Sequence, residues 1–329
     1  TVWWEKLEQL VLANNSPLLD TWWMEACVYA AFRQGDLQKT VSTWREFVDK
    51  TQLAEVQFVQ DKGRVWLAMA YLQDGRIGEA QDIADKVINA ARVANNPMLH
   101  ALGLLVRALS QQGWGHTEDA RKSLNEALKS VCDPSVNCVD VQDQILVAQA
   151  QLHLDCEELD QALSIAQSLS ERHSKPGKKP HFVLAKAERI LGCVALKRGF
   201  GEQARSRLQT AMAISQTLED RIEQALCEHF LSQTSPARGQ VREADLHARS
   251  CEEILGSMGN SYFLRRLGYR DPTSKPICKA SKPQIRYAAP TDETIAPTSS
   301  DESEWVEKTL VSGELIVAKI STSEQNPKN

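Results

Sequence analysis

Apolar residues recur along this chain with the period of an α-helix, and short polar turns interrupt the pattern at regular intervals. Residues 68–84 show the unit: an apolar segment ends at Gly75, and a second amphipathic segment follows it. Glycine commonly ends a helix because it adopts the left-handed conformation without steric cost. The stretch therefore predicts two helices joined by a tight turn, with small side chains at Ala68, Ala80 and Ala84 where the helices pack.

The same unit occurs six times along the chain. Its turn residues are spaced 40, 40, 42, 42 and 40 positions apart, at Gly35, Gly75, Gly115, Glu157, Gly199 and Gly239. Five residues after the turn stands alanine in every unit except the first, at Ala80, Ala120, Ala162, Ala204 and Ala244. One helix pair of this kind cannot bury its apolar face alone, whereas stacked pairs bury a continuous core. The spacing therefore predicts a helical-repeat solenoid.

Glycine followed five residues later by alanine, with a small residue seven positions before the glycine, resembles the tetratricopeptide repeat (TPR). The resemblance covers about residues 20–260 and implies an all-α fold, a TPR-like α-α superhelix (solenoid) of about six helix pairs. The family's second alanine is met only by Ala127 and Ala211, and its aromatic residue before the turn only by Tyr71. The period also exceeds the usual length of about 34 residues. Such long-period arrays are similar to the cohesin-loader Scc4/MAU2 subunits and to the helical sensor regions of MalT-like signalling ATPases.

The segments on either side of the repeats differ in character. Residues 1–19 predict a partial repeat or an N-terminal helix, and residues 20–270 form the TPR-like domain. Residues 271–329 are rich in Pro, Ser and Thr and predict a disordered tail. Two short apolar runs within residues 308–320 predict a hairpin or a docking strand.

Composition and charge narrow the classes of function. The net charge of −5 argues against a general nucleic-acid binder, which would be basic. No apolar run reaches the roughly 18 residues of a membrane-spanning helix, and the chain does not open with a signal peptide. Eight cysteines occur without a CxxC pair, which is typical of reduced thiols in a cytoplasmic or nuclear protein.

The sequence also lacks the motifs of the common enzyme classes. It contains no phosphate-binding GxxxxGK[ST] loop, no GxGxxG, no HExxH and no GxSxG. Its seven histidines occur singly rather than in clusters that would bind a metal. We therefore expect no catalytic residue, no metal and no cofactor within this chain.

The resemblance to the TPR family implies which residues face the groove. In that family, inward positions of the first helix lie thirteen, ten, six and two residues before the turn glycine. Carried over to this chain, they are Trp22, Glu25, Tyr29, Arg33, Lys62, Met69, Gln73, Lys186, Arg189 and Lys197. The last three form a basic run, which predicts an acidic ligand; the alternative is a solvated helix face.

These observations favour a non-catalytic scaffold that binds an extended or helical segment of another protein in its concave face. The alternative is a helical sensor or regulatory region of a larger ATPase, cyclase or protease, whose catalytic part lies outside this chain. A further hypothesis concerns the tail, where acidic residues surround Trp305. Such a segment could fold back onto the basic helix and compete with the partner.

Overall fold

The computed structural model describes residues 36–53, 57–132, 136, 138–174, 181–234 and 241–269, and the two strands 306–309 and 315–318. The chain divides into two compact units, Thr1–Pro272 and Thr273–Asn329. Residues 1–35, for which the sequence predicts a partial repeat and part of the groove, lie outside the described residues. None of the described helices is long and apolar enough to cross a membrane.

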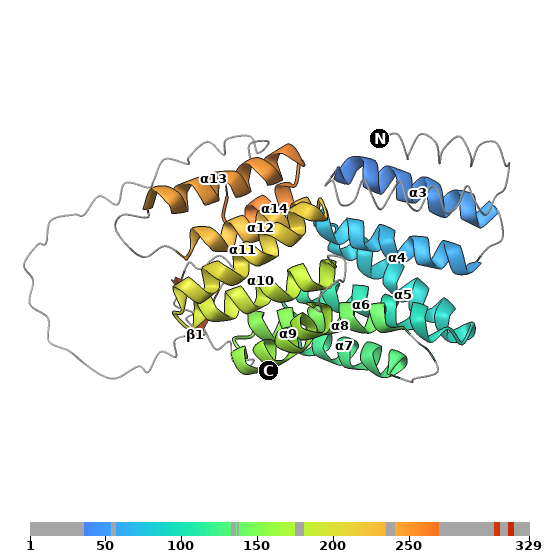
Figure 1. Ribbon diagram of the computed structural model, residues 1–329. Helices are drawn as coiled ribbons and strands as arrows, with labels where there is room; N and C mark the ends of the chain where they lie inside the picture. The colour runs from blue at the N-terminus through green and yellow to red at the C-terminus, as the bar shows by residue number, and fades with distance from the viewer. Residues whose placement is uncertain are drawn as a thin grey trace, which may run out of the picture. The chain divides into compact units, whose positions relative to one another are not determined.

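The described part of the first unit consists of helices that follow one another along the chain (Figure 1). In chain order they are α3 Leu37–Leu53, α4 Gln57–Gln73, α5 Ile77–Val93, α6 Pro97–Gly113, α7 Thr117–Val131, α8 Val139–Asp155, α9 Leu159–His173, α10 Phe182–Lys197, α11 Gly201–Thr217, α12 Arg221–Ser232, α13 Val241–Ser257 and α14 Ser261–Arg266. The sequence pattern assigns α3 to the second half of the first repeat, and the pairs α4–α5 to α12–α13 to the next five.

Packing between helices separates an inner from an outer layer. Each helix packs on the next in sequence, and the first helices of successive pairs also contact one another: α4 with α6, α6 with α8, α8 with α10, and α10 with α12. The first helices therefore form the inner wall of the array, and the second helices lie outside it. The all-α, TPR-like superhelix that the sequence predicts is confirmed.

The turns within the pairs explain the regular spacing. The anchor residues Gly75, Gly115 and Gly199 have φ angles of 77°, 79° and 79°. In each turn the next amide reaches back across the helix end; the Arg76 N–H, for example, donates to the Tyr71 carbonyl at 2.8 Å. This arrangement satisfies carbonyl groups that the helix end would otherwise leave unpaired. The fourth anchor, Glu157, has the same conformation with a φ of 62°.

Small residues allow the close approach of paired helices. The alanines that follow each turn by five residues are fully buried in the four repeats from Ala80 to Ala204. At Gly192, a Cβ atom would lie 2.7 Å from the Leu208 Cγ atom, so even alanine would collide with the facing helix. The repeated small residues therefore determine how closely the two layers pack.

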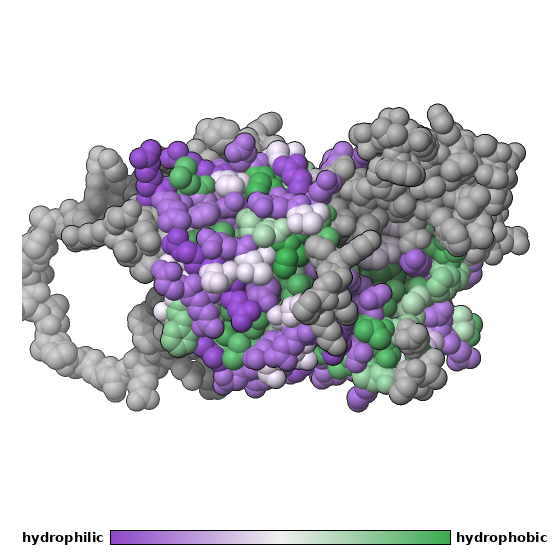
Figure 2. All heavy atoms as spheres, in the orientation of Figure 1, coloured by the Kyte–Doolittle hydropathy of each residue, from purple (hydrophilic) through white to green (hydrophobic). Residues whose placement is uncertain are grey.

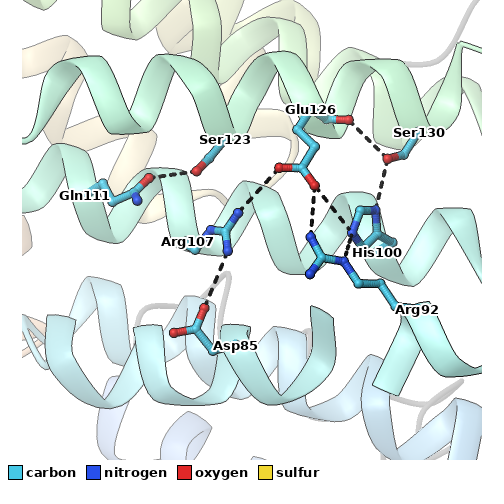
Figure 3. Close-up of polar contacts among 8 residues, drawn as sticks. All are labelled: Asp85, Arg92, His100, Arg107, Gln111, Ser123, Glu126 and Ser130. Atoms are coloured by element: carbon cyan, nitrogen blue, oxygen red, sulfur yellow. Dashed lines mark hydrogen bonds and ion pairs between the residues drawn. The ribbon is translucent and has the colours of Figure 1, made fainter. Parts of the chain in front are cut away.

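Polar contacts link α5, α6 and α7 (Figure 3). The Arg107 guanidinium on α6 lies 3.8 Å from the Asp85 carboxylate on α5 and 3.6 Å from the Glu126 carboxylate on α7. On α6, the His100 Nδ1 atom is 3.0 Å from the Ser130 hydroxyl of α7. Consecutive repeats are thus joined by charged and hydrogen-bonded side chains as well as by their apolar core.

The second unit contains a two-stranded antiparallel sheet. Its strands are β1 Val306–Thr309 and β2 Leu315–Ala318, with Val306 opposite Ala318 and Thr309 opposite Leu315. The two strands lie in and next to residues 308–320, the segment whose sequence predicts a hairpin or a docking strand.

Candidate binding cavity on the inner wall

A cavity of about 470 Å³ lies on the inner wall of the first unit. Its lining comes mostly from the first helices of the pairs, α4, α6, α8, α10 and α12, and from α14. This volume is within the range of roughly 300–1,000 Å³ that is usual for ligand sites. The repeat architecture therefore creates a concave site to which successive repeats each contribute one helix.

Most of the cavity wall is apolar and aromatic. The apolar residues that line it include Trp66, Met69, Leu72, Leu105, Leu109, Val147, Phe182, Leu226, Phe230 and Phe263. By contrast, Figure 2 shows mostly hydrophilic residues over α10–α13 on the face turned to the viewer, with apolar residues scattered among them. An apolar concave wall with a few polar groups is typical of a binding site, since the apolar area supplies affinity and the polar groups supply orientation.

A chain of hydrogen bonds crosses the cavity wall from α6 to α12. The Gln112 amide on α6 donates to the Asp155 carboxylate of α8 at 2.6 Å, and the Gln151 amide donates to the other oxygen of Asp155 at 2.7 Å. The Arg189 guanidinium of α10 donates to the Gln151 carbonyl oxygen at 3.0 Å and to the Glu223 carboxylate of α12 at 2.6 Å. We call these five residues the polar ladder. It connects the first helices of four successive repeats.

The buried end of the polar ladder is an ion pair. The side chains of Arg189 and Glu223 are 8% and 3% exposed. Burial opposes the charged form of Arg189, but the Glu223 carboxylate outweighs it and raises the pKa of the guanidinium. Arg189 therefore stays charged, and its ion-pair partner inside the protein is Glu223.

The chemistry around this ion pair does not suit a nucleophile or a metal. Burial raises the pKa of the nearby Cys193 thiol to about 12, so the reactive thiolate is not formed near neutral pH. The described residues contain no group of three or more His, Cys, Asp or Glu side chains that could hold a metal ion. This part of the wall can therefore bind a ligand through polar contacts.

Lys186 differs from Arg189 although it lies only one helical turn away. The residue is half-buried in the cavity wall, and its ammonium nitrogen lies 5.7 Å from the centre of the Phe182 ring. Among the described residues, no carboxylate lies within the 4.0 Å of an ion pair from this ammonium. The cavity therefore presents one half-buried cation that the described part of the protein does not neutralise.

The groove residues inferred from the TPR resemblance separate into three groups. Met69, Gln73, Lys186 and Arg189 line the cavity. Lys62 and Lys197 are not among its lining residues, and the Lys197 ammonium lies 3.3 Å from the Glu157 carboxylate. The remaining four, Trp22, Glu25, Tyr29 and Arg33, lie outside the described residues.

The structure shows that two of the three cations in the predicted basic run have carboxylate partners within the protein. The sequence places Lys186, Arg189 and Lys197 on one side of α10, which suggests three positive charges facing a ligand. In the structure, Glu223 neutralises Arg189 and Glu157 pairs with Lys197, because repeats next to α10 supply the acidic partners. Of the three, only Lys186 faces the cavity without a carboxylate partner among the described residues.

Sequence reasoning did not identify several residues of the wall. Gln112, Gln144, Gln151 and Asp155 are polar residues of α6 and α8, and Phe182, Phe230, Tyr262 and Phe263 contribute aromatic rings. A signal was present for some of them, since Gln112 and Asp155 lie three and two positions before their turn anchors, near the position of Gln73. Applying the same position before the turn to the other repeats would therefore have added Gln112 and Asp155 to the expected groove residues.

The fold is shared with solved helical-repeat structures. The crystal structure of BtubC (BKLC) from P. vanneervenii matches with a TM-score of 0.50 and 16% identity, over 81% of this chain and 99% of that one. The Rap conjugation gene regulator of plasmid pLS20, solved in complex with the Phr* peptide, matches with a TM-score of 0.57 and 14% identity, over 74% of this chain and 67% of that one. These likenesses place the chain among TPR-like helical-repeat folds.

Sequence comparisons add no closer relative. A scan against protein-family models gave no match, and a comparison with curated protein sequences gave none.

Proposed function

We propose that this protein is a non-catalytic scaffold that binds a short peptide segment of a partner protein in the inner-wall cavity. The observation that carries the proposal is the cavity itself, in which an apolar, aromatic wall is crossed by the polar ladder. Apolar side chains of a peptide fit such a wall, and its backbone amides match the donors and acceptors of glutamine side chains. The structural likeness to a Rap regulator in complex with a peptide supports the same class of ligand.

Other roles predicted from the sequence are compatible with this site but remain predictions. A regulatory region of a larger enzyme would use the same cavity to sense its ligand. The finer resemblance to cohesin-loader subunits or MalT-like sensors, and the expected absence of catalysis, rest on the sequence. Trp305 and the acidic residues before it, predicted to contact α10, lie outside the described residues.

A peptide selection tests the proposed function. Random peptides displayed on phage are selected on the full chain and then measured against two variants that carry the same substitution on α8. Gln144→Trp fills the cavity that Gln144 lines, whereas Gln142→Trp changes a residue that does not line it. Peptides that bind the wild type and Gln142→Trp but lose at least about tenfold in affinity for Gln144→Trp support the proposal. Peptides that bind all three proteins equally would place recognition elsewhere.

A further inference from the structure

We infer that the ligand of the cavity carries a carboxylate next to apolar side chains, and that Lys186 is the residue that selects it. This inference rests on the proposed function, because it names the chemistry of the peptide that would occupy the same cavity. Its basis is the difference between Lys186 and every other charged group in the cavity wall.

Each carboxylate in the wall already has donors. Glu223 is paired with Arg189, and Asp155 accepts from two glutamine amides of the polar ladder. Asp220 precedes α12 and accepts from the Glu223 backbone N–H at 3.1 Å, where the positive end of the helix dipole stabilises its charge. A basic ligand would therefore find no carboxylate without hydrogen-bond partners in this wall.

The cations of the wall are not equivalent. The Arg189 Nε donates to Glu223 and its Nη1 donates to Gln151, so this cation is already paired inside the protein. Arg266 is exposed, and water can solvate its charge. Lys186 is half-buried beside Phe182, where the ring face offers only a weak attraction for the ammonium group. An ammonium group on a half-buried residue that has no carboxylate partner among the described residues gains most when a ligand brings a carboxylate.

The surroundings of Lys186 indicate what else the ligand carries. Phe182, one turn before Lys186 on α10, and Val147 on α8 also line the cavity. When the carboxylate of a ligand reaches the ammonium group, the ligand's neighbouring side chains lie against Phe182 and Val147. These side chains should therefore be apolar. The same chemistry can come from the C-terminus of a peptide or from an internal Asp or Glu side chain.

Three matched fluorescent probes separate these sources. The first is dansyl-Leu-Phe-Leu with a free carboxylate, the second is its neutral carboxamide, and the third is dansyl-Leu-Glu-Leu carboxamide. Their affinities for the full chain are measured by fluorescence titration at low ionic strength. We expect at least one carboxylate-bearing probe to bind about tenfold more tightly than the neutral probe, since hydrogen bonds to charged groups are worth more than neutral ones. The tighter of the two identifies a terminal or a side-chain carboxylate.

Three variants assign the preference to Lys186. Lys186→Met keeps the length of the apolar stem and should remove the preference, and Lys186→Arg restores a cation and should recover most of it. Lys122→Met is the control, because Lys122 is an exposed residue of α7 that does not line the cavity. It should leave the preference unchanged.

Three results would overturn the inference: equal binding of charged and neutral probes to the wild type, a preference that persists in Lys186→Met, or no binding of any probe. If the neutral probe binds equally well and Gln144→Trp abolishes its binding, the cavity binds peptides but Lys186 does not select them. If none of the probes binds, the carboxylate assignment fails, and the peptide selection alone decides the proposed function.

Discussion

At the scale of single residues, Glu157 occupies a backbone conformation that suits glycine. Its φ is 62°, and its amide donates to the Leu154 carbonyl at 3.2 Å, as the glycines of the equivalent turns do. A residue with a Cβ atom is strained in this region by about 1–2 kcal/mol. The turn therefore forms without glycine because the repeat packing on both sides determines its geometry.

Replacing Glu157 by glycine should stabilise the protein. Relief of the left-handed strain outweighs the greater freedom of glycine in the unfolded chain, and we expect a net gain of about 0.5–1 kcal/mol. Chemical denaturation measures the free energy of unfolding. Glu157→Gln is the control, since it keeps the strain and loses only the exposed contact with Lys197, and it should change stability by less than about 0.5 kcal/mol. A destabilising Glu157→Gly would show that the side chain matters more than the backbone.

The shifted pKa values of two histidines predict how the free energy of unfolding depends on pH. Burial lowers the pKa of His100 and of His229 below the ordinary value of 6.5. For His100 the neighbouring Arg92 guanidinium, whose Nε lies 3.2 Å from the imidazole Nε2, acts in the same direction. The unfolded chain then binds more protons than the folded one. The stability contributed by neutral histidine is therefore complete above about pH 6.5 and is lost progressively as the pH falls.

Substituting His100 by glutamine should reduce this loss. We expect the difference in the free energy of unfolding between about pH 7.5 and about pH 5.5 to be smaller in His100→Gln than in the wild type. His116→Gln serves as the control, because His116 is exposed in the turn before α7. An unchanged difference in His100→Gln would show that His100 does not titrate in this range.

At the scale of elements, the polar ladder fixes the position of one inner helix relative to the next. The Arg189–Glu223 pair joins α10 to α12 and is almost fully buried. Removing one member leaves the other charge buried and unpaired, which costs about 3–5 kcal/mol. Replacing both members by apolar residues removes that cost.

This asymmetry gives a testable order of stabilities. Arg189→Met and Glu223→Met should each destabilise the protein by about 3–5 kcal/mol, whereas the double variant should be less destabilised than either single variant. The free energy of unfolding is measured by thermal and urea denaturation for the wild type, the two single variants and the double variant, which together form a double-mutant cycle. Additive effects of the two substitutions would mean that the charges do not depend on each other.

The sequence predicts elements well and contacts between repeats poorly. The turn glycines and the buried alanines follow from local rules, because helix ends and close helix packing each require particular residues at fixed spacing. The partners of Arg189 lie 34 and 38 residues away, on α12 and α8. A helical pattern places Arg189 on a face of α10, but it does not show that the neighbouring repeats present Glu223 and Gln151 to it.

At the scale of the whole first unit, its last helix packs against an early turn. The Tyr262 ring of α14 lies so close to the α4–α5 turn that a Cβ atom on Gly75 would be 2.6 Å from the Tyr262 Cδ2 atom. The turn glycines Gly115 and Gly199 have almost the same φ angle but nothing within 4 Å of such an atom. The superhelix therefore brings the two ends of the cavity wall into contact, which the repeat pattern alone does not predict.

Alanine substitutions at these glycines measure that contact. All three should destabilise the protein through backbone strain, but Gly75→Ala should cost at least about 1 kcal/mol more, because it also overpacks against Tyr262. In a Tyr262→Ala background, most of the excess should disappear. Equal costs at all three glycines would indicate that α14 does not press on the α4–α5 turn.

If the inner-wall cavity is where a partner peptide binds, photo-crosslinking can locate the peptide there. A benzophenone amino acid replaces Arg266, an exposed residue of α14 that lines the cavity, or, in a second protein, Lys122 on the exposed face of α7. Each protein is irradiated with a peptide from the phage selection, and mass spectrometry identifies the products. We predict crosslinks from position 266 and none from position 122. Crosslinks from position 122 without any from position 266 would show that the peptide binds on the outer layer instead.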